Sequence, residues 1–211
     1  MAQEGILIVF SGFSGAGKGT IMKELLKRYP DTYALSVSAT TRAPRPGETE
    51  GIEYFFKTRE EFEKMIEKQE LIEYARYVEN YYGTPKAYVE EQLLKGKDVI
   101  LEIEIQGALN IKKMFPRALL LFVATCDAKT LKERLLGRGT ETLDVIHARL
   151  KRAGEESQGM ENYDYLVVNE DLEHTVEQVH SIICNEHKRV SHNLDFIARI
   201  REDLEGFLKG E

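Results

Sequence analysis

The stretch GILIVFSGFSGAGKGT, residues 5–20, decides the fold of this chain. Its apolar run ends in glycine, as expected for a strand that is buried on both faces. The segment Gly12–Thr20 then follows the GxxxxGK pattern, and residues 21–29 carry apolar side chains at helical spacing. Strand, glycine loop and helix in this order predict a phosphate-binding loop at the start of an α/β domain.

Such a loop binds phosphate because its glycines let backbone N–H groups converge on the phosphate oxygens, at the positive end of the following helix. Lys18 is expected to reach the β and γ phosphates. A glycine turn that merely links strand to helix is the alternative, and the matching context on both sides disfavours it. The loop residues expected to contact ATP are Gly12, Ser14, Gly15, Ala16, Gly17, Lys18, Gly19 and Thr20.

Gly19 departs from the usual pattern, which has Ser or Thr after the lysine. The hydroxyl that ligates Mg²⁺ from this position is therefore missing. Thr20 can contact a phosphate or the metal. We expect water and phosphate oxygens to hold Mg²⁺, which keeps several waters in most protein sites.

Composition limits the partners of the chain. With 211 residues and a net charge of −7, it has no basic field to attract nucleic acid. The apolar runs are too short to span a bilayer, and the N-terminus lacks a secretory signal, so no membrane association is expected. Cys126 and Cys184 form no CxxC pair, and a reducing cytoplasm is the expected location.

The rest of the chain alternates strand and helix patterns, which predicts a parallel sheet covered on both faces. Residues 33–56 instead show short, broken segments typical of a small antiparallel lobe. Within that lobe, Thr58 and Glu61 predict a capping box, LIEYARYV predicts a strand, and NYYG (80–83) predicts a turn. The apolar residues after Asp171 follow a helical period, as one long helix or two.

Several motifs together resemble the guanylate kinase family, over about Gly5 to Cys184. They are GKGT, SVSATTRAPRPGE, EYFF, LIEYARYVENYYGTP, LEIEIQGA, RLLGRGTET and VVNED, which occur in this order. The resemblance implies the P-loop nucleoside monophosphate kinase fold: a three-layer core with a five-stranded parallel sheet, an inserted mixed-β lobe that binds GMP, and a helical lid. The core is expected at 5–35, 97–127 and 161–184, the lobe at 36–96, the lid at 128–160, and a helical extension at 185–211.

The same resemblance implies that ATP phosphorylates GMP, and dGMP, to the diphosphate for purine nucleotide metabolism and GMP recycling. It assigns catalysis to Lys18, Arg42, Arg134, Arg138 and Arg149. The residues implied around GMP are Ser38, Arg42, Arg45, Tyr54, Glu73, Tyr82, Gly83, Thr84, Glu102 and Glu104. Arg134, Arg138 and Asn169 join the loop on the ATP side. Either Glu102 or Glu104 can be the one that contacts guanine or a metal-bound water.

These residue types suit the reaction. A single carboxylate at Glu73 accepts both N1–H and the amino group of guanine, whereas adenine would leave it unpaired. The rigid turn around Pro44 is expected to aim Arg42 and Arg45 at one phosphate. No catalytic base is required, because a phosphate monoester is mostly ionised at neutral pH. Cationic groups and Mg²⁺ therefore supply the catalysis.

Two rival functions remain at the sequence level. A guanylate-kinase-like domain can serve as a peptide-binding scaffold module, and a kinase of the same fold can act on another acceptor, such as a phosphorylated ribose. The intact phosphate loop disfavours the first, and Ser38, Glu73 and Thr84 disfavour the second. In the C-terminal extension, an apolar stripe permits either self-association as a homo-oligomer or packing onto its own domain.

Overall fold

The computed structural model describes residues 4–77, 79–137 and 142–209. Its main sheet has five strands in the order β2–β7–β1–β8–β9, and every neighbouring pair is parallel. The strands are β1 (Leu7–Gly12), β2 (Tyr33–Leu35), β7 (Asp98–Leu101), β8 (Leu119–Ala124) and β9 (Tyr165–Val168). This arrangement confirms the predicted α/β fold with a five-stranded parallel core.

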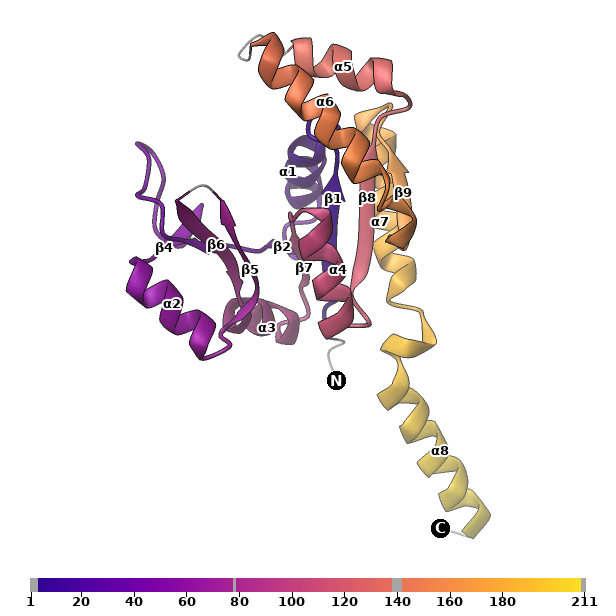
Figure 1. Cartoon of the computed structure of the whole chain (residues 1–211). Coiled ribbons are helices and arrows are strands. Elements are labelled where there is room, and N and C mark those ends of the chain that lie inside the picture. Colours follow the sequence, from indigo (N-terminus) through magenta and orange to yellow (C-terminus); the bar gives the residue numbers. More distant parts are fainter. Residues whose placement is uncertain (1–3, 78, 138–141, 210–211) are drawn as a thin grey trace.

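Helices cover both faces of this sheet (Figure 1). On one face, Ile8 and Phe10 of β1 pack with helices α1 (Lys18–Arg28) and α7 (Leu172–Glu186) in one buried cluster. On the other face, Leu7 and Val9 belong to a cluster with helices α3 (Lys86–Leu94) and α4 (Ile105–Met114). Successive residues of β1 point to opposite faces, which explains why its sequence is apolar without interruption.

A second, mixed sheet forms the lobe to the left in Figure 1. Its strand order is β4–β3–β6–β5, in which β3 pairs parallel with β4 and the other pairs are antiparallel. The strands are β3 (Ser38–Thr40), β4 (Tyr54–Phe56), β5 (Leu71–Tyr77) and β6 (Asn80–Pro85), with helix α2 (Arg59–Glu67) beside them. The predicted capping box of Thr58 and Glu61 begins α2.

The predicted turn at residues 80–83 is wrong, because Asn80, Tyr81, Tyr82 and Gly83 all lie within β6. Tyrosine side chains favour extended backbone, and this strand pairs on both sides, with β3 and β5. Sheet pairing therefore overrides the turn propensity of Asn and Gly at this position.

Helices α5 (Ala128–Gly137) and α6 (Leu143–Ser157) form a separate unit at the top of Figure 1, followed by the short 3-10 helix η1 (Met160–Asn162). They share a small buried cluster of Leu131, Leu135, Ile146 and Ala153. A side chain added at Gly15 would lie 3.0 Å from Leu135, so α5 lies directly over the glycine loop.

The C-terminal segment forms two helices rather than one. After α7, a short 3-10 helix η2 (Val190–His192) leads into α8 (Leu194–Lys209), which projects away from the body (Figure 1). In the described part of the chain, no helix combines the length and apolar character that crossing a bilayer requires.

Candidate active site

The glycine loop joins the end of β1 to the start of α1, at the carboxyl edge of the parallel sheet. Gly12, Gly15 and Gly17 have φ values of 146°, 96° and 95°, which favour glycine. The side chain of Lys18 turns back over the loop, where Nζ donates to the carbonyl oxygens of Gly12 at 2.8 Å and Phe13 at 3.3 Å. The loop thus holds the Lys18 ammonium against its own backbone at the N-terminus of α1, a position that favours a phosphate.

A cavity of about 580 Å³ opens over this loop. Its lining residues are Ser14, Gly15, Gly17, Lys18, Gly19, Thr20, Lys23 and Glu102. Glu102, which follows β7, contributes a carboxylate whose Oε1 lies 4.0 Å from Lys18 Nζ. Lys23 was not among the sequence-predicted contacts, although it lies on the same helix, one turn after the loop.

Arg134 and Asn169 both contact the backbone of the glycine loop at Ala16. Asn169 follows β9, is buried, and donates from Nδ2 to the carbonyl oxygen of Ala16 at 2.7 Å. Arg134 of α5 donates to the carbonyl oxygens of Ala16 at 3.2 Å and Asn169 at 2.8 Å. Both side chains therefore contact the loop backbone itself, which they hold in the shape that the glycines permit.

Arg149 reaches the loop from α6, where its Nη1 donates to Ser14 Oγ. The structure therefore brings Arg134 and Arg149 together with Lys18 at one end of the core. Arg138, the third arginine predicted in this group, lies outside the described residues.

The lobe holds a partly buried carboxylate at Glu73. Glu73 of β5 lies opposite Thr84 of β6, and Thr84 Oγ1 donates to Glu73 Oε1 at 2.8 Å. Burial raises the pKa of Glu73, although hydrogen bonds from the side chain and backbone of Thr84 oppose this rise. Gly83 allows the close approach of the two strands, because a Cβ there would lie 2.8 Å from the carbonyl oxygen of Glu73.

Arg42 lies among the lobe aromatics. Its guanidinium is 5.3 Å from the centroid of the Tyr54 ring and 6.0 Å from that of Phe56. Tyr54 in turn meets Tyr82 edge to face at 6.0 Å. The lobe thus brings a cation and two phenol rings together, and their contact with a phosphate stays a prediction.

Glu48 holds this cation in place, and the sequence reasoning missed it. Its Oε1 accepts a hydrogen bond from Arg42 Nη2 at 2.8 Å, and its Oε2 accepts one from the backbone N–H of Arg45 at 2.7 Å. The contact with Glu48 raises the pKa of Arg42, and Arg42 lowers that of Glu48. The signal was present in the motif itself, where Glu48 ends the segment RPGE.

The remaining predicted residues occupy more open positions. Ser38 begins β3 and pairs with Tyr54, while the side chain of Arg45 is exposed. Glu104 precedes α4 and forms an ion pair with Arg152 of α6, rather than with the loop lysine. Glu102 and Glu104 therefore point to different partners, and only Glu102 lines the cavity over the loop.

The described residues include no cluster of three or more His, Cys, Asp or Glu side chains arranged to hold a metal ion. The carboxylate of Glu102 and the hydroxyl of Thr20 nevertheless both line the cavity over the loop. Mg²⁺ is usually bound through one or two such oxygens, water and substrate phosphates, so this donor set fits it.

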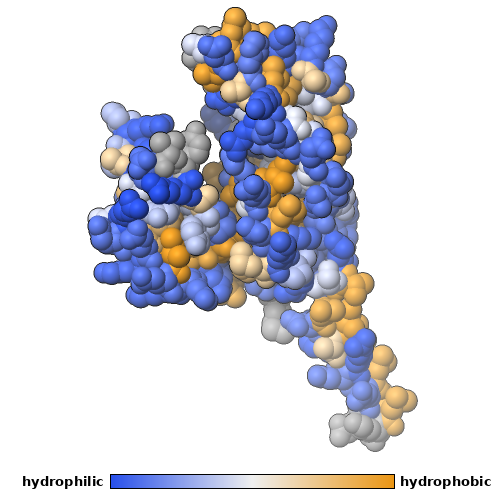
Figure 2. All heavy atoms as spheres, in the orientation of Figure 1, coloured by the Kyte–Doolittle hydropathy of each residue, from blue (hydrophilic) through white to orange (hydrophobic). Residues whose placement is uncertain are grey.

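The two groups of residues lie on different parts of the molecule. The loop, Lys18, Arg134 and Arg149 belong to the core and the α5–α6 unit, whereas Glu73, Thr84 and Arg42 belong to the lobe. Figure 2 shows the surface hollowed between this lobe and the column that carries α5 and α6. Such an arrangement suits two ligands that approach each other from opposite sides.

Comparison with known proteins gives one consistent result. Residues 4–186 match the model of the guanylate kinase family. The guanylate kinase of Bacillus anthracis is 48% identical over 203 residues, which cover 96% of this chain and 99% of the relative. That of Streptococcus thermophilus (strain CNRZ 1066) is 52% identical over 190 residues, or 90% and 91% of the two chains.

A solved structure is similar over most of the chain. The crystal structure of guanylate kinase from Anaplasma phagocytophilum matches with a TM-score of 0.69 and 33% sequence identity. The match covers 89% of each chain. Both the core and the lobe therefore have counterparts in a protein of known structure.

Proposed function

This chain belongs to the guanylate kinase family and phosphorylates GMP to GDP with ATP, and we propose that the carboxylate of Glu73 selects the guanine base. The observation that carries this proposal is the 2.8 Å hydrogen bond from Thr84 to Glu73 inside the lobe. This bond orients a partly buried carboxylate, which suits the two adjacent donors of guanine. AMP offers an acceptor at N1 instead and is rejected.

Arg42 and Arg45, with Tyr54 and Tyr82, form the proposed site for the GMP phosphate. Arg42 is held by Glu48 and lies against two aromatic rings, so its guanidinium is ordered before GMP binds. Ser38, Gly83 and Thr84 are the proposed neighbours of the base. We also propose dGMP as a second acceptor.

ATP is the proposed occupant of the cavity over the glycine loop. Lys18 and the backbone N–H groups of the loop bind its phosphates, and Asn169 lies beside the adenine in this proposal. Arg134, Arg138 and Arg149 neutralise the charge that develops as the phosphoryl group moves between two anionic nucleotides.

Mg²⁺ is the proposed metal, held mainly by phosphate oxygens and water. Glu102 and Thr20 are the side chains proposed to contact this hydrated ion. When bound, the ion neutralises charge on the phosphates of ATP.

Closure of the lobe (36–96) and the lid (128–160) over the core (5–35, 97–127 and 161–184) is proposed to exclude water, which would otherwise compete with GMP as the nucleophile. The cytoplasm is the proposed location, and both cysteines are free and exposed, which suits a reducing compartment. The exposed apolar side chains of α8 support one more proposal, self-association of the chain through this helix.

An assay of ADP release tests the substrate assignment. We expect turnover with GMP and dGMP, and turnover at least about 100-fold lower with AMP and ribose phosphates. Equal rates with GMP and AMP would contradict the role of Glu73 without affecting membership of the family. A requirement for Mg²⁺ is checked in the same assay by adding a chelator.

A further inference from the structure

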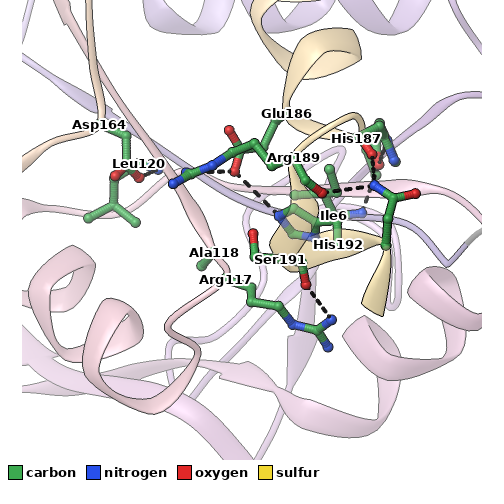
Figure 3. Close-up of polar contacts among 12 residues, drawn as sticks. Ile6, Arg117, Ala118, Leu120, Asp164, Glu186, His187, Arg189, Ser191 and His192 are labelled. Atoms are coloured by element: carbon green, nitrogen blue, oxygen red, sulfur yellow. Dashed lines mark hydrogen bonds and ion pairs between the residues drawn. The ribbon is translucent and has the colours of Figure 1, made fainter. Parts of the chain in front are cut away.

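The turn between α7 and α8, residues 187–193, is held against the body of the protein by side-chain contacts. Glu186, at the end of α7, is buried, and its Oε1 accepts a hydrogen bond from Arg189 Nη1 at 3.0 Å. The same oxygen lies 3.3 Å from Nε2 of His192, in η2 (Figure 3). A buried carboxylate therefore holds side chains from both ends of this turn.

Further contacts secure the same turn. Asn193 Nδ2 donates to the carbonyl oxygens of His187 and Arg189, both at 2.8 Å. Arg117, which lies between α4 and β8, donates from Nη1 to the carbonyl oxygen of Ser191 at 3.3 Å (Figure 3). These contacts hold the turn that precedes α8, and they therefore also determine the direction in which the helix projects.

Helix α8 presents an apolar stripe to solvent. Ile197, Ile200, Leu204 and Phe207 are spaced by three, four and three residues, the pattern of a helix seam that packs against another helix. Leu204 is 56% exposed, Phe207 is 75% exposed and the adjacent Leu208 is 87% exposed. Figure 2 shows hydrophobic surface along the projecting helix.

The exposed area is large enough for an interface. Six apolar residues of α8 are at least 42% exposed: Leu194, Phe196, Ile200, Leu204, Phe207 and Leu208. Together they leave on the order of 600 Å² of apolar surface in water, the upper end of what a monomer usually exposes in one patch. Pairing with a second copy would bury on the order of 1,200 Å², at the lower end of stable interfaces.

The charges of α8 favour an antiparallel neighbour. The residues before Glu202 have a net positive charge, from Arg199 and Arg201 against Asp195, whereas those after it have a net negative charge, from Asp203 and Glu205 against Lys209. Two antiparallel copies that cross at Glu202 place the basic half of each beside the acidic half of the other. A parallel pair would set like halves together, and would also align the two helix dipoles unfavourably.

The apolar stripe fits the same alignment. Crossing at Glu202 sets Ile200 level with Leu204 of the partner subunit and Ile197 level with Phe207 of the partner subunit. Because α8 projects from the body, the two bodies then lie at opposite ends of the helix pair (Figure 1). The glycine loops lie at the far end of each core from α8, so each site closes independently.

We infer that α8 is a dimerisation helix that pairs antiparallel with α8 of a second copy of this chain. This inference rests on the self-association proposed above and is independent of catalysis. A lipid surface is a poorer occupant, because acidic residues outnumber arginines among residues 194–208 and would be repelled by anionic headgroups.

Sedimentation velocity of the full chain tests the interface. We expect the wild type to be a dimer that dissociates on dilution. Leu204→Asp should raise the dissociation constant at least about tenfold, because it places a charge in the apolar seam. Ala198→Asp adds the same charge to the same helix outside the stripe and should leave the dimer intact.

Measuring kinase activity per chain distinguishes a failure of the dimerisation proposal from a failure of the proposed roles in substrate binding. Leu204→Asp should keep wild-type activity, which also shows that the protein is folded. A wild type that stays monomeric at all concentrations, or a Leu204→Asp variant that stays dimeric, overturns the inference. So does binding of the wild type to phosphatidylserine vesicles through α8 in place of dimerisation.

Point substitutions are preferable to truncation, since removal of the tail after Lys188 would take Arg189 and His192 away from buried Glu186.

Cysteine cross-linking tests the orientation, in a Cys126→Ser and Cys184→Ser background. In the antiparallel pair, two copies of position 197 are about 15 Å apart along the helix, too far for a disulfide. The double variant Ile197→Cys with Phe207→Cys should therefore form disulfide-linked dimers on mild oxidation, whereas Ile197→Cys alone should not. Efficient cross-linking of the single variant would reveal a parallel pair and overturn the antiparallel assignment.

Discussion

Thr84 Oγ1 donates a hydrogen bond of 2.8 Å to Glu73 Oε1 across the paired strands β5 and β6. The two residues are neighbours only because these strands run antiparallel, and Gly83 lets them approach closely. The bond orients a carboxylate that burial would otherwise destabilise. The oriented carboxylate of Glu73 can therefore accept further hydrogen bonds from a ligand that supplies donors, as guanine does.

Glu73→Gln should lower kcat/KM for GMP by about 100-fold or more, because the amide presents a donor where guanine also presents donors. The preference for GMP over AMP should shrink by a similar factor. Steady-state rates with both nucleotides measure this. Glu70→Gln is the matched control, since Glu70 is exposed next to the same strand and should have no effect.

Affinity for GMP should fall as the pH drops through the raised pKa of Glu73, because the protonated carboxyl no longer accepts both donors of the base. Burial places this pKa above the ordinary value of 4.5. KM for GMP is measured across this range in the wild type and in Glu73→Gln. The phosphate of GMP also titrates, and its effect on KM is the same for both proteins. Plots of KM against pH that run parallel for the wild type and Glu73→Gln would therefore contradict the prediction.

The stability of the folded protein should change in the opposite direction with pH. The unfolded chain loses the Glu73 proton at lower pH than the folded one, so the free energy of unfolding should fall as pH rises from about 4.5 through the raised pKa. The free energy of unfolding can be measured by urea titration at several pH values in this window. It should fall less steeply with pH for Glu73→Gln than for the wild type.

Glu48→Gln should raise KM for GMP about fivefold with little change in kcat, because it weakens the charge-assisted hydrogen bond that orders Arg42. Glu60→Gln, on the exposed start of α2, is the control. A fall of about fivefold in kcat with KM unchanged would contradict this prediction. It would mean that Glu48 acts during phosphoryl transfer rather than in positioning Arg42 before GMP binds.

Gly17→Ala and Gly19→Ala should behave differently although they are two residues apart. A Cβ at Gly17 would lie 2.4 Å from Asn169 Nδ2 at a φ of +95°, so we expect a loss of about 1–3 kcal/mol in unfolding free energy and a higher KM for ATP. A Cβ at Gly19 meets no described atom within 4 Å, and thermal unfolding should show no loss of stability.

Gly19→Ser should lower the Mg²⁺ concentration needed for half-maximal activity, because it restores the hydroxyl that loops of this type usually supply. There is space for the side chain, as the Cβ distances at Gly19 indicate. Mg²⁺ titrations compare this variant with Gly19→Ala. Identical titrations for the two variants would mean that the hydroxyl does not reach the metal in this protein.

The amino-acid sequence alone predicted the features that depend on neighbouring residues. The glycine loop, the buried strand before it and the capping box of Thr58 and Glu61 were recognisable because each is specified by side chains within a few positions. The same reasoning failed at residues 80–83, where Asn and Gly suggest a turn and the neighbouring strands impose an extended backbone.

Only the tertiary structure decided which distant side chains meet. Arg149 contacts Ser14 across 135 positions of the chain, and Arg42 pairs with Glu48 because the intervening loop folds back. The position of α8 likewise depends on the buried carboxylate of Glu186 at the end of α7. Local sterics and hydrogen bonds fix the elements, whereas the packing of the core determines which of their side chains share a site.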